Sequence, residues 1–120
     1  MKDESTKQIW SLLQSQTKTY RQGAWRPSAD VYRDMKGWLV KFDLAGIRSE
    51  DIQLNVIGRH LTIEGIRRDW SIKTGQKSYS MEIDYNRFER SVELPANVEN
   101  AQITTEYQDG MLLVRLQLES

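Results

Sequence analysis

Apolar and polar residues alternate along most of the chain, in short segments that turns separate. A period of two places successive side chains on opposite faces, which is typical of a strand with one buried side. About eight short strands at a spacing of roughly 8–12 residues, with no second helix of any length, predict an all-β fold, an antiparallel β-sandwich. The alternating segments are 31–35, 38–44, 51–57, 60–66, 78–84, 88–94, 101–107 and 111–118.

The connections between these segments carry residues that suit tight turns. Gly58 and Arg59 join two strands as a hairpin, and Asp109 and Gly110 suit the positive φ angles that a short turn requires. Pro95 ends the strand before it because proline has no N–H group for the sheet. The connections therefore favour antiparallel neighbours.

One connection differs from the others in length. Residues 67–77 are polar and rich in turn formers, and they lead into an alternating segment with Tyr79, Met81 and Ile83 on one side. Long loops in compact domains are usually functional or disordered. This loop is therefore the unusual feature of the predicted sandwich.

Residues 1–26 have a different composition, rich in Gln, Ser, Thr and Lys. Ser5 and Thr6 are suitable N-caps for a short helix, but its apolar side is too short to hold a helix without a partner surface. We expect a short, mobile, partly helical N-terminal arm, which either docks on its own domain or binds a partner or client protein. The apolar residues of this arm are Ile9, Trp10, Leu12 and Leu13.

The charge balance bears on the choice of partners. The chain has 17 basic and 17 acidic residues, whereas nucleic-acid binders gain affinity mainly by neutralising phosphates. Basic and aromatic residues mix at Tyr20–Arg26 and at Arg67–Trp70, near Lys73 and Lys77, and single-stranded nucleic acid is an alternative ligand there. We interpret the first patch as a linker and the second as a solvated loop, and we expect no nucleic-acid partner. The neutral charge leaves self-association unopposed.

The sequence indicates neither a membrane span nor a secretory signal. No apolar run approaches the roughly 18 residues that a membrane span needs. The first ten residues, MKDESTKQIW, carry acidic side chains and lack the apolar core of a signal peptide. The chain has no cysteine, which excludes disulfides and thiolate sites, and a reducing cytoplasm is the expected location.

No set of residues suggests catalysis. His60 is the only histidine, and nothing completes a triad or a metal site around it. The acidic pairs Glu50-Asp51 and Glu82/Asp84 are expected in turns or on exposed faces. The glycines are scattered at turns rather than gathered in a phosphate-binding loop. We therefore expect no enzyme activity, no cofactor and no metal.

A series of short motifs follows the predicted strands in a fixed order. They are Pro27–Tyr32, Trp38–Gly46, Glu50–Ile52, Leu61–Gly65, Phe88–Arg90, Glu93–Pro95 and Asp109–Leu112. In order and spacing, though not singly, they resemble the α-crystallin domain of bacterial small heat-shock proteins, with Met111 where valine is usual. The resemblance covers residues 27–118 and implies an immunoglobulin-like sandwich, which the arm 1–26 precedes and a stub, 119–120, follows.

The resemblance implies a homodimer formed by strand exchange, and often higher oligomers. In the bacterial type the long loop carries a strand that pairs with the first strand of the partner, so each chain covers the other's exposed edge. Here residues 78–84 would pair with residues 30–33 of a second copy. Arg90 matches the arginine of the family's Phe-x-Arg segment, which is often at the dimer interface; the alternative is an ordinary strand arginine that extends from the sheet. The implied interface comprises Asp30, Val31, Tyr32, Arg33, Tyr79, Met81, Ile83 and Arg90.

The resemblance also implies an apolar groove between the strands 51–57 and 101–107. Its lining would be Leu54, Val56, Ile103 and Thr105. In family members this groove receives a tail with an Ile-x-Ile or Ile-x-Val motif, whereas this sequence ends at Gln117–Ser120 without that motif. We therefore expect small assemblies and a groove that is open to another protein's segment.

The function that the resemblance implies is that of an ATP-independent holdase chaperone of the stress response. Such a protein binds partly unfolded clients and prevents their aggregation. The alternative on the same fold is a protein-interaction module, similar to the CS-type co-chaperone domains or to an assembly subunit. Those domains lack the loop strand, so the segment 78–84 favours the chaperone.

Overall fold

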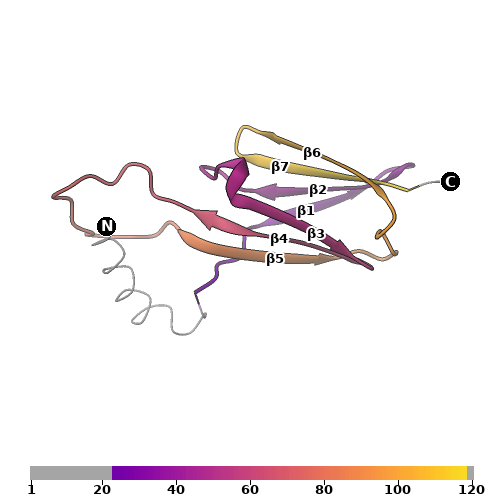
Figure 1. The fold of residues 1–120 in the computed structure, drawn as a ribbon, viewed down its shortest axis with the longest axis horizontal. Helices are drawn as coiled ribbons and strands as arrows, with labels where there is room; N and C mark the ends of the chain where they lie inside the picture. Colours follow the sequence, from indigo (N-terminus) through magenta and orange to yellow (C-terminus); the bar gives the residue numbers. More distant parts are fainter. Residues whose placement is uncertain (1–22, 119–120) are drawn as a thin grey trace.

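The computed structural model describes residues 23–118. Two antiparallel sheets face each other, one of four strands in the order β1-β2-β7-β6 and one of three in the order β3-β4-β5 (Figure 1). The predicted all-β antiparallel sandwich is confirmed. The strands are β1 (Ala29–Arg33), β2 (Gly37–Asp43), β3 (Ile52–Ile57), β4 (His60–Arg67), β5 (Asn86–Glu93), β6 (Gln102–Gln108) and β7 (Met111–Gln117), and a single 3-10 turn, η2 (Ser49–Asp51), precedes β3.

The predicted alternation produces the core between the sheets. Val40 and Phe42 of β2 point inward and are fully buried, whereas Asp43 is exposed. Leu61 and Ile63 of β4 face them from the other sheet and are also fully buried. Removing a side chain of this size from water stabilises the fold by about 1.5–3 kcal/mol. The remaining large buried side chains include Trp25, Leu44, Ile47, Phe88, Leu94, Val98, Val114 and Leu116.

Local chemistry fixes where the strands end. β1 stops at Arg33, earlier than the predicted segment 31–35, because the Asp34 carboxylate accepts hydrogen bonds from the backbone N–H groups of Lys36 and Gly37 at 2.8 and 2.9 Å. This turn points Met35 into solvent. At the other end, Asp109 and Gly110 have φ angles of 52° and 81°, as the predicted turn requires.

Gly65 of β4 lies where a connection crosses closely over the sheet. A Cβ atom at this position would lie 2.0 Å from the backbone oxygen of Asp51 and 2.7 Å from the ring of Phe88. Only glycine allows this approach, which brings η2 close to the end of β4.

The chain between β4 and β5 forms a long loop, residues 68–85, that extends beyond the two sheets (Figure 1). The predicted strand 78–84 is not a strand in the single chain, where the described residues form seven strands rather than eight. A strand needs a neighbour for its backbone hydrogen bonds, and no described strand lies beside this segment. Its alternation therefore leaves apolar side chains in solvent.

The first described residues belong to the segment that the sequence assigns to the arm. Trp25 is buried against Phe88, with ring centroids 5.4 Å apart. Its backbone pairs with β5 through bonds to Arg87 and Glu89, both of 3.0 Å. The arm's apolar residues, Ile9, Trp10, Leu12 and Leu13, lie outside the described residues.

Candidate protein-binding surfaces

β1 forms an outer edge of the four-stranded sheet. Among the described strands it pairs only with β2. Val31 lies opposite the buried Val40 but is itself 43% exposed. Tyr32 lies on the other face, where the Lys41 ammonium group is 5.2 Å from its ring. An edge strand offers unpaired backbone groups to another strand. The exposed side chains on this edge are Asp30, Val31, Tyr32 and Arg33.

The loop 68–85 presents a row of apolar side chains to solvent. Tyr79 is fully exposed, and Met81 and Ile83 are 57% and 63% exposed. Ser80 and Glu82 alternate with them, so a partner strand would meet one apolar side and one polar side. Within one chain these residues do not meet β1, because the loop extends beyond the sheets (Figure 1).

Arg90 joins β5 to the segment before β1. Its Nη1 donates to the backbone oxygen of Pro27 at 2.9 Å. Its Nε is buried and, among the described residues, has no hydrogen-bond partner. Burial, together with the charge of Arg26, lowers the pKa of Arg90. A buried N–H group without an acceptor is unfavourable, so Arg90 is held in place at some cost to stability.

The four residues of the expected groove lie on two edge strands. Leu54 and Val56 on β3 are half-buried and pack against the core, whereas Ile103 and Thr105 on β6 are exposed. β3 and β6 are each at the end of their sheet. The Gly58 N–H after β3 donates to the Glu99 carboxylate before β6 at 3.0 Å. The groove itself stays a prediction.

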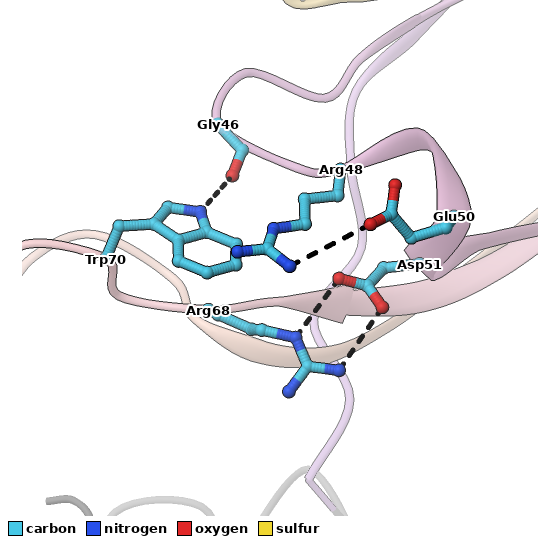
Figure 2. Close-up of polar contacts among 6 residues, drawn as sticks. All are labelled: Gly46, Arg48, Glu50, Asp51, Arg68 and Trp70. Carbon is cyan, nitrogen blue, oxygen red and sulfur yellow. Dashed lines mark hydrogen bonds and ion pairs between the residues drawn. The ribbon is translucent and has the colours of Figure 1, made fainter.

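The start of the loop carries a cluster that the sequence reasoning did not identify (Figure 2). The indole N–H of Trp70 donates to the Gly46 carbonyl at 3.2 Å. The Arg48 guanidinium lies 3.6 Å from the centroid of the Trp70 ring, flat against it. Arg68 binds Asp51 with two hydrogen bonds of 3.1 and 3.2 Å. The sequence signal was the mixture of basic and aromatic residues at 67–70.

The ion pair in this cluster alters the acidity of both groups. The hydrogen bond from Arg68, reinforced by its charge, lowers the pKa of Asp51. The same bond raises the pKa of Arg68. Both groups are therefore charged at neutral pH, and the two-pronged geometry is the stronger form of such a pair.

Arg67 holds the two ends of the loop together. Its Nε donates to the Ala45 carbonyl at 3.0 Å, and its Nη1 donates to the Asp84 carbonyl at 2.8 Å. Its guanidinium also lies 4.4 Å from the centroid of the Trp25 ring. Next to it, burial raises the pKa of the Tyr85 hydroxyl. The loop therefore leaves and re-enters the sandwich at one fixed place.

The described residues do not assemble a chemical site. His60 is exposed, and its Nε2 lies 4.0 Å from the Glu93 carboxylate. No group of three or more His, Cys, Asp or Glu side chains in residues 23–118 is placed to hold a metal ion. Within the same range, no helix has the length and apolar character needed to cross a membrane.

Residues 30–120 match the model of a protein family described as the Hsp20/alpha crystallin family. Because this match spans most of the chain, the chain belongs to that family, and the predicted resemblance is confirmed. Small heat shock proteins are generally ATP-independent chaperones rather than enzymes. They form oligomers and bind unfolded client proteins.

Individual relatives show the same relationship. Small heat shock protein C2 of Rickettsia felis is 29% identical over 90 residues, which cover 75% of this chain and 58% of that protein. The chain also spans 55% of small heat shock protein C4 of the same organism. Among solved structures, heat shock protein 16.0 from Schizosaccharomyces pombe is similar with a TM-score of 0.68 and 26% identity, over 77% of this chain and 86% of the other. HspA from Xanthomonas axonopodis has a TM-score of 0.64 and 26% identity, over 78% and 93%.

Proposed function

We propose that this protein is an ATP-independent holdase that binds partly unfolded proteins and prevents their aggregation. The observation that carries the proposal is that an α-crystallin-type sandwich exposes apolar side chains both on the loop, in the row Tyr79, Met81 and Ile83, and on β6, at Ile103. Monomeric soluble proteins rarely expose a contiguous apolar surface of this kind without a partner for it. A reducing compartment suits a chain without cysteine, and we propose the cytoplasm as its location.

The first partner of this surface is a second copy of the chain. The segment 78–84 has the alternation of a strand but no neighbour, and β1 has a free edge with exposed apolar side chains. Pairing of the segment with β1 of a second copy would give the segment a neighbour and would cover the free edge of β1. The reciprocal contact closes a two-fold dimer. Arg90 holds the segment that leads into β1 through its hydrogen bond to the Pro27 carbonyl, and we assign it to the dimer interface as a positioning residue.

Clients bind to the apolar surfaces that the dimer leaves open. We assign this role to the groove residues Leu54, Val56, Ile103 and Thr105 and to the arm 1–26. If these surfaces cover about 500 Å² of apolar client surface, the gain is about 12 kcal/mol. Association costs about 4–15 kcal/mol, so one site binds weakly. Two sites in one dimer raise the effective concentration and convert weak binding into useful, reversible capture.

Aggregation assays test this proposal. Two unrelated heat-labile proteins are heated without nucleotide, alone and with the full chain at an equal subunit ratio, and light scattering is recorded. The proposal predicts that scattering falls for both clients. A dimeric preparation that suppresses neither client would refute the holdase and leave the interaction module, which would bind one specific protein.

A further inference from the structure

We propose that Arg48, Asp51, Arg68 and Trp70 form a root clamp that sets the direction in which the loop leaves the sandwich, and thereby the affinity of the loop for a second copy of this chain. This inference rests on the proposed dimer. It adds to that dimer a set of positioning residues that lie outside the expected interface.

The root clamp acts at the point where the sheet stops guiding the chain. The β4–β5 ladder ends at the pair Arg67 and Asn86. Arg68 and Trp70 follow this pair along the chain. Each of these two side chains binds the connection between β2 and β3 rather than its own sheet. Figure 2 shows the Trp70 ring next to both the Gly46 carbonyl and the Arg48 guanidinium, with the Arg68–Asp51 pair below them. The first turn of the loop is thus fixed against a second, independent segment.

Beyond the root clamp, the loop has little to hold it. Among the described residues, the hydrogen bonds of residues 71–83 stay within the loop: Ser71 binds Asp69, and Lys73 and Gln76 bind each other. The direction of this stretch is therefore set at its two ends. At the far end, Arg67 binds the Asp84 carbonyl and Trp25 binds the Asn86 carbonyl.

Trp70 also borders a hollow that it shares with the returning part of the loop. Its side chain lines an open hollow together with Ile83 and Tyr85, which lie on the returning part. Ile83 is one of the apolar residues that we assign to the dimer interface. A shift of the Trp70 ring would therefore change the shape of the hollow that Ile83 borders.

The contribution of these ion pairs to the stability of the sandwich does not by itself explain the root clamp. Arg48, Glu50 and Arg68 are more than half exposed, whereas Asp51 is 14% exposed. Ion pairs with at least one exposed partner contribute only modestly to the free energy of unfolding. A loop that is held in its bound direction loses less freedom on association, which strengthens binding without a new contact. The geometry of the root clamp suits this second purpose, which is to hold the loop in its bound direction before association.

The test compares dimer dissociation constants of full-length variants by sedimentation velocity. We expect Trp70→Ala and Arg68→Glu each to raise the dissociation constant about tenfold, the factor that corresponds to ordering roughly one further residue of free backbone. The charge-exchanged double variant Arg68→Asp with Asp51→Arg should restore it to within about threefold. Arg59→Glu is the matched control, because Arg59 pairs with Glu93 at the opposite end of the sandwich and is equally exposed.

A second readout separates positioning from loss of folding. The thermal midpoint of each variant is measured at concentrations at which every protein is monomeric. Trp70→Ala should leave it at the wild-type value, whereas Arg68→Glu should lower it slightly, because the pair with Asp51 is lost, and the exchanged pair should recover it. If Trp70→Ala and Arg68→Glu leave the dissociation constant within about twofold of the wild type, or if the exchanged pair fails to restore it, the root clamp is refuted.

Failure of the dimer itself is recognised with Met81→Asp. This substitution buries a charge in the proposed interface and should abolish the dimer. If it does not, the proposed dimer fails, and the root clamp is then judged by the loop position alone.

The position of the loop is measured with spin labels. Because the chain has no cysteine, labels at Ser80→Cys and Thr104→Cys report one distance per labelled chain when unlabelled protein is in excess. Trp70→Ala should broaden that distance distribution, and an unchanged width would overturn the root clamp.

Discussion

The guanidinium group of Arg67 lies over the indole ring of Trp25, 4.4 Å from its centroid. Through this contact, the first described segment of the chain meets the root of the loop 68–85. The same guanidinium binds the carbonyls of Ala45 and Asp84. One side chain therefore connects the segment around Trp25, the β2–β3 connection and both ends of the loop.

Arg67→Ala should lower the free energy of unfolding by about 1–2 kcal/mol, because two hydrogen bonds and a cation–π contact are lost together. Urea denaturation of the monomer measures this change. Arg87→Ala is the control, since Arg87 is exposed and pairs only with the surface residues Glu64 and Glu89; its effect should stay within about 0.5 kcal/mol. Equal effects of the two substitutions would contradict the role given to Arg67.

Gly65→Ala should destabilise the sandwich by about 1–3 kcal/mol, because the added methyl group would overlap the Asp51 carbonyl and the Phe88 ring. Urea denaturation again gives the value. Gln53→Ala, at an exposed position on the neighbouring strand β3, should have almost no effect. A neutral Gly65→Ala variant would mean that η2 moves freely relative to β4.

The Asp51–Arg68 pair makes stability depend on pH. Because the pKa of Asp51 is lowered in the folded protein, its stabilising contribution is complete above the unfolded carboxyl pKa of about 3.9. The contribution is lost as the pH falls below that value through the folded pKa. Asp51→Asn should therefore be less stable than the wild type at pH 6, and the difference should shrink toward pH 3.

The Arg68→Gln background is the control for that titration. Without the guanidinium, Asp51→Asn should have little effect on urea denaturation at either pH. A difference that persists in this background would assign the pH dependence to another partner of Asp51.

Val31→Lys should raise the dimer dissociation constant at least about tenfold, because a lysine on an edge strand opposes the addition of a further strand. Val31 is 43% exposed, so the monomer should remain folded. Thr104→Lys is the matched control on β6, the opposite edge of the same sheet. Sedimentation velocity measures the dimer dissociation constant of each of the two variants. A dimer that Thr104→Lys weakens and Val31→Lys does not would place the interface on the other edge.

Much of the fold follows from local sequence patterns. The alternation at 38–44 predicted β2 and its buried face, because the side-chain period of a strand is set by its backbone. Asp109 and Gly110 predicted the last hairpin because both residue types accept positive φ angles, which the structure shows at these positions. In each case the signal and its structural consequence lie within a few residues.

What the sequence did not reveal depends on contacts between distant residues. Trp70 and Gly46 are 24 residues apart, and Arg68 and Asp51 are 17 apart, so no local period marks them. The mixture of arginine and tryptophan at 67–70 was visible, but it is typical of a solvated loop and did not point to a contact with residues 46–51. The segment 78–84 has a strand's alternation, yet a strand forms only beside a neighbour, and no strand within residues 23–118 lies beside this segment.

The most direct test of the central claim measures solution mass and client aggregation on the same sample. Multi-angle light scattering of the full chain over a range of concentrations is combined with suppression of thermal aggregation of two unrelated clients, without nucleotide. The account predicts a dimer or larger species that suppresses both clients, and a Met81→Asp variant that loses the dimer. A protein that stays monomeric at all concentrations and protects neither client would contradict it.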